Sequence, residues 1–119
     1  MRAVHRPSDG PERVLATDVD VADSLLGKAR GLMFRRSIPG GYALVFRFGR
    51  TTVRGLHMVC VPFDIDAVWL VDGRVERTKR LQAWRGYGRA RGDTVLELPA
   101  GAAAAVESGD RIELVGDDG

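Results

Sequence analysis

The dipeptide Asp72-Gly73 constrains the fold of this chain more than any other feature of its sequence. It separates the apolar run IDAVWLV, residues 65–71, from the alternating run RVERTKRL, residues 74–81. A two-residue turn between antiparallel strands requires positive backbone φ angles, and Asp-Gly is one of the dipeptides that adopt them readily. The sequence therefore predicts an antiparallel β-hairpin over residues 65–81.

Three segments that precede this hairpin also have the composition of strands. Residues 13–21 (RVLATDVDV) and residues 42–48 (YALVFRF) place every second side chain on one face, which is the period of a β-strand. Residues 51–61 are rich in β-forming residues but are interrupted by Gly55. We expect Pro62 to end or bulge this strand, because proline has no N–H group for a central ladder.

The pattern changes after the hairpin. Residues 85–93 are rich in glycine and arginine and are expected to form an exposed loop, whereas TVLEL, residues 94–98, is expected to form a strand. Residues 100–106 are expected to form one or two helical turns. The turn at residues 108–110 leads into a last strand, RIELV.

A short helix is expected before the strand at residues 42–48. Asp23 or Ser24 is a suitable N-cap, Gly31 is a suitable helix end, and the interior Gly27 weakens the helix. Together these patterns predict a mainly β fold, α+β at the margin. We expect a compact β-sandwich or a barrel-like fold with about seven strands and one or two short helices.

The length and composition fit one small domain. The 119 residues are expected to form a single β-rich domain over residues 13–115, with a flexible lead-in over residues 1–12 and a flexible tail over residues 116–119. The single cysteine, Cys60, excludes a disulfide within the chain. Neither a signal-peptide pattern nor an apolar run of ~20 residues is present. We expect a soluble, cytoplasmic monomer without a membrane span.

Four motifs follow one another along the chain. GLMFR, residues 31–35, is followed by a proline-glycine turn and the apolar strand LVFRF, residues 44–48. The pair His57-Met58 precedes Asp66, and D-G-R-V follows it. The last motif is V-L-E-L-P-A-G, residues 95–101.

This combination resembles the family catalogued as domain of unknown function 192, which is also described as an uncharacterised archaeal and bacterial family. Many of its members carry W-M-x-N-T where this chain has HMVCV, and the pair His57-Met58 resembles an archaeal-looking branch with H-M in that place. Val59, Cys60 and Val61 replace polar residues of the common pattern. The resemblance implies a compact, mostly β domain and brings no established activity with it.

Arg35 is the first candidate site residue. Its neighbours Met33 and Phe34 are expected to point into the core, while the guanidinium of Arg35 reaches either a bound anion or a carboxylate, with Asp66 or Glu97 as the expected partner. Asp66 lies within an apolar strand, where a carboxylate must be paired or hydrogen-bonded. Both carboxylates are therefore interpreted as members of structural pairs or, alternatively, as ligand contacts.

His57 is the second candidate. It fits a structural histidine with one hydrogen-bond partner, a ligand contact, or a general base working with Asp66 or Glu97. The spacing of His57, Cys60 and Asp66 defines no zinc site, and His5 lies in the expected lead-in, so we expect neither a metal nor a cofactor. Our leading hypothesis is a noncatalytic domain that binds a small ligand or a protein partner through Arg30, Met33, Arg35, His57, Met58, Asp66 and Glu97.

Two alternatives remain open. The 18 basic and 16 acidic residues nearly balance, but the segment 74–91 is basic and carries two aromatic residues, which suits a nucleic-acid-binding surface. That surface would be formed by Arg74, Arg77, Lys79, Arg80, Trp84, Arg85 and Tyr87. The other alternative is an enzyme that uses His57 with an acidic partner, although no nucleophile elbow or phosphate-binding loop occurs.

Overall fold

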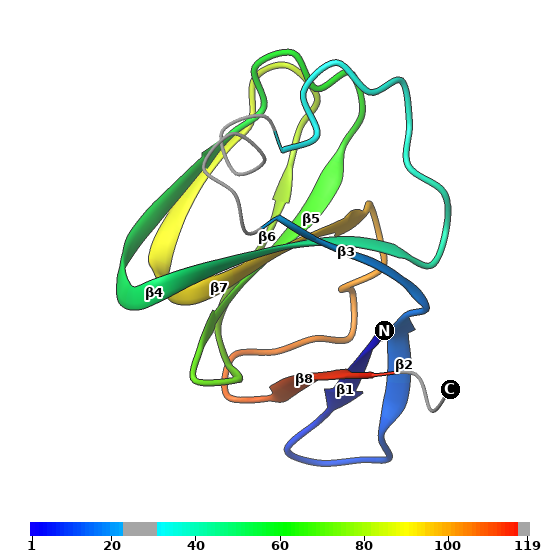
Figure 1. Cartoon of the computed structure of the whole chain (residues 1–119), viewed down its shortest axis with the longest axis vertical. Coiled ribbons are helices and arrows are strands. Elements are labelled where there is room, and N and C mark those ends of the chain that lie inside the picture. The colour runs from blue at the N-terminus through cyan, green and yellow to red at the C-terminus, as the bar shows by residue number, and fades with distance from the viewer. Residues whose placement is uncertain (23–30, 117–119) are drawn as a thin grey trace.

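The computed structural model describes residues 1–22 and 31–116, which form one open, eight-stranded sheet with the order β2-β1-β8-β6-β5-β7-β4-β3 (Figure 1). The strands are β1 (Arg2–Arg6), β2 (Arg13–Ala16), β3 (Asp18–Ala22), β4 (Tyr42–His57), β5 (Ile65–Val71), β6 (Arg74–Leu81), β7 (Tyr87–Pro99) and β8 (Arg111–Val115). Only β3 and β4 pair in parallel. The expectation of a mainly β fold is confirmed, with eight strands in place of seven.

The predicted hairpin is confirmed as the pair β5 and β6. Asp72 and Gly73 adopt φ angles of 52° and 80°, as the tight turn requires. The register between the two strands shifts at Trp69/Leu70, and a bulge of this kind moves the following side chains to the opposite face. Val75 therefore lies opposite Leu70 and packs in the same apolar layer.

Two apolar layers lie on opposite faces of β5. One contains Val68, Leu70 and Val75, and the other contains Trp69 and Leu81. The first six residues of β5 are all buried, as expected for a strand with neighbours on both sides and cover on both faces. This strand is the centre of the fold.

The long strands β4 and β7 bend together and correct two of our predictions. Residues 85–93 do not form an exposed loop, because Tyr87–Pro99 is continuous β-strand paired with β4. Residues 48–51 of β4 lie opposite the single residue Asp93, and this irregularity folds the strand back on itself. Gly55 does not interrupt β4. It provides space for the Tyr87 hydroxyl, which lies 2.9 Å from the position that a Cβ at residue 55 would occupy.

The N-terminal residues are part of the sheet, so the expected flexible lead-in over residues 1–12 is wrong for strand β1. This strand pairs with β2 on one side and with β8 on the other. The Nε2–H group of the fully buried His5 donates a hydrogen bond of 2.8 Å to the Asp110 carboxylate at Oδ2. Ser8 N also donates to Asp110 Oδ1, at 3.0 Å, which ties the β1–β2 loop to the turn before β8.

The segment predicted as one strand over residues 13–21 is two strands, β2 and β3. The backbone N–H groups of Thr17 and Asp18 both donate to Gly41 O, at 2.9 and 3.0 Å. This contact turns the chain at Thr17, so that β2 joins β1 while β3 joins β4.

The expected helices are not present in the part of the chain that the structure describes. Residues 100–106 form successive turns instead of a helix, and each turn is closed by a hydrogen bond between residues three apart, such as Ala104 N to Gly101 O at 3.2 Å. The helix expected before Gly31 and most of the tail, residues 117–119, fall on residues outside the described ranges. Within these ranges no helix has the length and apolar character needed to cross a lipid bilayer.

Candidate functional site

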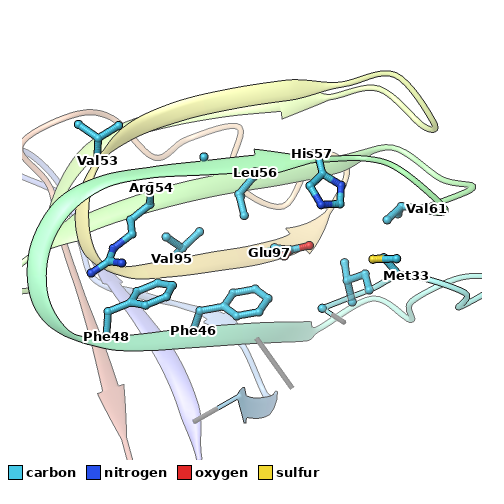
Figure 2. Close-up of a pocket in the computed structure, with 13 residues that line it drawn as sticks. Met33, Phe46, Phe48, Val53, Arg54, Leu56, His57, Val61, Val95 and Glu97 are labelled. Atoms are coloured by element: carbon cyan, nitrogen blue, oxygen red, sulfur yellow. The ribbon is translucent and has the colours of Figure 1, made fainter. Parts of the chain in front are cut away.

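A cavity of about 590 Å³ lies between the two arms of the bent strand β4 (Figure 2). Its size is that of a small-molecule site. Its walls are mostly apolar, and its lining is formed by Gly31, Leu32, Met33, Phe46, Phe48, Val53, Arg54, Gly55, Leu56, His57, Val61, Val95 and Glu97.

The bend of β4 explains why these residues face one another. Phe46 and Phe48 lie on the outgoing arm, whereas Leu56 and His57 lie on the returning arm, so the cavity separates residues that are close in sequence (Figure 2). Strand β7 pairs with both arms and contributes the inner wall. The turn after Gly31 closes one end with Met33.

Glu97 is the acidic group of the cavity. It is 6% exposed, and burial raises the pKa of its carboxyl from 4.5 to about 7, while the nearby Arg35 guanidinium opposes this rise. Among the described residues the interaction found for this carboxyl is the charge of Arg35, and no hydrogen bond or ion pair joins it to another described side chain. Within residues 1–22 and 31–116, Glu97 is therefore a buried carboxyl that faces the cavity without a hydrogen-bond partner.

Arg54 is the basic group of the cavity, and its guanidinium is already engaged. Its Nη2 donates to Arg50 O at 2.7 Å and its Nε donates to Gly92 O at 3.2 Å. The guanidinium carbon also lies 3.9 Å from the centre of the Phe48 ring, in cation–π contact. These contacts hold Arg54 against the bend and direct its charge toward backbone carbonyls.

His57 is exposed and belongs to the rim of the cavity. The Val59 backbone N–H donates to His57 Nδ1 at 3.3 Å, so the neutral ring carries its proton on Nε2. The imidazole can therefore offer one N–H donor to a molecule in the cavity.

Arg35 contacts neither of the carboxylates that we expected as its partners. Its Nη1 donates to the Tyr42 hydroxyl at 2.9 Å, and this hydroxyl donates to Asp20 Oδ2, also at 2.9 Å. Burial raises the Tyr42 pKa, and the hydrogen bond to Asp20 acts in the same direction. The three residues connect the turn after Gly31 to β3 and β4.

Asp66 lies apart from the cavity. It accepts hydrogen bonds from Gly101 N at 3.0 Å and Ala103 N at 2.9 Å, and it forms an ion pair with Arg80. These contacts match the structural interpretation of this carboxylate, which organises the turns after β7. Met58 is buried in the core and is not part of the lining, and Arg30 lies outside the described residues.

Three basic side chains of the predicted nucleic-acid-binding surface form hydrogen bonds or an ion pair within the protein. Arg77 Nη1 donates to Arg89 O and Lys79 Nζ donates to Tyr87 O, each at 2.8 Å, while Arg80 is held by Asp66. The remaining members of that set, Arg74, Trp84, Arg85 and Tyr87, are all exposed.

Phe34 corrects another expectation, because it is 68% exposed and does not enter the core. Phe34, Cys60 and Trp84 all have positive φ angles, of 68°, 61° and 67°. Phe34 N donates to Cys60 O at 2.8 Å and Trp84 N donates to Val61 O at 3.0 Å, so three loops are joined at one end of the molecule. Left-handed conformations are uncommon for large side chains, and no sequence pattern indicated them.

Sequence reasoning identified Met33, His57 and Glu97 of the cavity lining. It placed Phe46 and Phe48 on one face of a strand without proposing them as site residues, and it missed Arg54. The described residues contain no group of three or more His, Cys, Asp or Glu side chains that could hold a metal ion.

The fold and this cavity define a small, mainly β protein with an apolar pocket and one buried acid. The chain belongs to the DUF192 family, described as "Uncharacterized ACR", whose family model matches residues 6–114. No curated protein matches it.

Two solved structures share the fold. One, from Sinorhizobium meliloti 1021, is described as a "putative transcription regulator"; it is 25% identical, with a TM-score of 0.82 over 94% of this chain and 91% of that chain. The other is a protein of unknown function from Novosphingobium aromaticivorans DSM 12444, 21% identical, with a TM-score of 0.81 over 95% of this chain and 84% of that chain.

Proposed function

We propose that this protein is a noncatalytic binding domain for a small, largely apolar molecule that occupies the cavity between the arms of β4. The observation that carries the proposal is the buried Glu97 carboxyl, which faces apolar walls without a protein partner in the described chain. A concave, mostly apolar pocket with a few polar groups is the usual form of a small-molecule site. Here Glu97 is the inner polar group and His57 is the polar group at the rim.

The lining also favours binding over nucleophilic catalysis. Among the described residues it contains one histidine and one glutamate but no serine, threonine or cysteine. An acid–base role for His57 with Glu97 remains an alternative, since both residues line the same cavity. Turnover of a bound substrate that is lost in both His57→Gln and Glu97→Gln would replace the binding proposal with this alternative.

A neutral fluorescent probe tests the binding proposal. N-phenyl-1-naphthylamine gains fluorescence in apolar sites, and we expect it to bind the wild-type chain with one saturable site. Val53 lies on the cavity and is 49% exposed, so Val53→Trp is expected to fill the space without disturbing the core. Val14, on β2, is 48% exposed and lies away from the cavity, which makes Val14→Trp the matched control.

Loss of probe binding in Val53→Trp and its retention in Val14→Trp would support the proposal. Equal binding by both variants, or no saturable binding by the wild type, would contradict it.

A second candidate function is nucleic-acid binding through the segment 74–91. It is favoured by the description of the Sinorhizobium meliloti structure and by the exposed Arg74, Trp84, Arg85 and Tyr87. Such binding weakens steeply as salt rises, because phosphate contacts release counterions. Retention of DNA or RNA at low salt that is lost in Trp84→Ala with Arg85→Ala would establish it, whereas no retention at low salt would exclude it.

Three further predictions from the sequence belong to this proposal: the histidine–methionine branch of the family, a cytoplasmic location and a monomeric state. Light scattering after gel filtration tests the monomer, and a mass of twice 13.0 kDa would contradict it.

A further inference from the structure

The Glu97 carboxyl determines which chemical class of ligand suits this cavity. Its side chain projects from β7 into the space between the arms of β4, on the side of Met33 and His57 (Figure 2). It is 6% exposed and lacks a hydrogen-bond partner among the described residues. An ionised carboxylate in this position is costly unless a donor or a cation approaches it.

The cationic side chains of the described cavity do not supply that partner. Arg54 is held by Arg50 O, Gly92 O and the Phe48 ring. Arg35 donates to the Tyr42 hydroxyl and influences Glu97 only through its charge at longer range. In the part of the chain that the structure describes, these two basic groups are therefore engaged elsewhere, and the Glu97 carboxyl can accept hydrogen bonds from a donor in the cavity.

The floor of the cavity brings the carboxylate close to an aromatic ring. The position that a Cβ at Gly31 would occupy lies 3.5 Å from Glu97 Oε1 and 3.3 Å from Cζ of Phe46. Gly31 also has a φ of 51°, which a side chain at this position would strain. The Glu97 carboxyl and the Phe46 ring therefore both lie beside Gly31, and all three residues line the cavity, so a ligand cation bound there can contact a carboxylate and an aromatic ring together.

We propose that the cavity selects a ligand with a protonated amine, whose N–H groups bond to the Glu97 carboxylate while its apolar part lies against Phe46 and Leu56. This inference rests on the proposed binding function and adds the class of ligand. An ammonium group supplies both the missing charge and several donors. A carboxylate or phosphate in the same place would be repelled by Glu97.

Binding of such a ligand is coupled to a proton. Burial keeps part of the Glu97 population neutral near pH 7, while the amine, with a pKa near that of lysine at about 10.4, stays charged. Association of the ammonium with neutral Glu97 releases the carboxyl proton to solvent and leaves an ammonium–carboxylate pair. Arg35 acts on Glu97 through its charge, and Arg54 and His57 are the other charged or titratable side chains of the described cavity region.

Three probes of matched shape test this inference: 2-phenylethylamine, 2-phenylethanol and 3-phenylpropionate. By isothermal titration calorimetry at pH 8 we expect the amine to bind at least tenfold more tightly than the alcohol, and the carboxylate to bind most weakly. The affinity for the amine is expected to fall about tenfold from pH 8 to pH 6, with proton release detected by comparing buffers of different ionisation enthalpy. His57→Gln is expected to preserve this release.

Glu97→Gln is expected to bind the alcohol as the wild type does and to lose its preference for the amine. Equal binding of amine and alcohol by the wild type, or a preference that survives in Glu97→Gln, would overturn the inference while leaving the binding function intact. Failure of all three probes and of N-phenyl-1-naphthylamine would instead refute the proposed function itself. Retained alcohol binding by Glu97→Gln also shows that this variant is folded.

Discussion

Glu97→Gln is expected to reduce the pH dependence of the free energy of unfolding. The folded chain holds the pKa of Glu97 at about 7, whereas the ordinary value, taken for the unfolded chain, is 4.5. Between these values the folded state binds more protons than the unfolded state, so stability falls as pH rises. The contribution of neutral Glu97 is fully present below pH 4.5 and is lost as pH rises through 7.

The size of the effect follows from the separation of the two pKa values. At about 1.4 kcal/mol per pKa unit, this separation corresponds to a loss of about 3 kcal/mol between pH 4.5 and pH 8. Glutamine has nearly the same shape and no charge, so the variant is not expected to lose this amount. Relative to the wild type, Glu97→Gln is therefore expected to gain about 3 kcal/mol of stability over this range.

Urea denaturation at pH 4.5, 6 and 8 measures this difference, with tryptophan fluorescence as the signal. Trp69 is fully buried and Trp84 is exposed, so unfolding changes the environment of Trp69 strongly. The difference between variant and wild type cancels the titration of all groups that the two chains share. Glu76→Gln, at an exposed position on β6, is the matched control and is expected to show no such trend.

A difference between Glu97→Gln and the wild type that changes by less than about 1 kcal/mol from pH 4.5 to pH 8 would refute the reasoning. It would mean that the carboxyl is hydrated or paired in solution, and that the cavity does not hold a desolvated acid.

Further predictions concern the contacts that hold the fold. Asp66→Ala is expected to lower the free energy of unfolding by about 3–5 kcal/mol, because two backbone N–H groups lose their acceptor. Replacement of its half-exposed partner Arg80 by alanine is expected to lower it by about 1 kcal/mol or less. Equal losses for the two variants in urea denaturation would contradict this. The hydrogen bond from His5 is the main reason that the pKa of Asp110 is lowered to about 2. The ionised Asp110 is therefore expected to stabilise the chain above pH 3.8, and this stabilisation is lost as pH falls toward 2. An acid-unfolding curve that is unchanged in Asp110→Asn would contradict this. Gly88→Ala is expected to cost about 1–3 kcal/mol, because its Cβ would lie 2.9 Å from the Trp69 ring, and an unchanged melting temperature would show that the ring can move.

The parts of the fold that depend on local sequence were predictable. The Asp72-Gly73 hairpin follows from the φ preferences of two residues and from the patterns on either side. The strand at residues 111–115 and its preceding turn were also found from local chemistry.

The bend of β4 and β7 was not predictable in this way, because it depends on pairing between distant segments. Gly55 and Gly88 looked like strand breakers, but each makes room for an aromatic ring, that of Tyr87 or Trp69. The same glycines that suggested a loop therefore allow close packing within a strand. The N-terminal strand β1 was missed because Pro7 and its neighbours suggested a flexible segment, while the burial of His5 depends on Asp110 at the other end of the chain.

The candidate site was only partly predictable, because the sequence indicates unusual polar residues but not which of them the bend of β4 brings together. Glu97 and His57 stood out as polar residues within apolar strands, and the bend brings both to one cavity. Asp66 stood out equally, yet its partners are the turns after β7, which alternation alone does not locate. Arg54 gave no signal because its role depends on the bend itself.

Methyl NMR with neutral 2-phenylethanol tests the central claim most directly, because it locates a small apolar ligand without depending on charge. We predict saturable shifts in the methyl signals of Met33, Leu56 and Val95, which line the cavity, and no shift at Val14 on β2. The shifts are expected to disappear in Val53→Trp. Absence of shifts at the cavity methyls in the wild type, or unchanged shifts in Val53→Trp, would contradict the assignment of this cavity as the binding site.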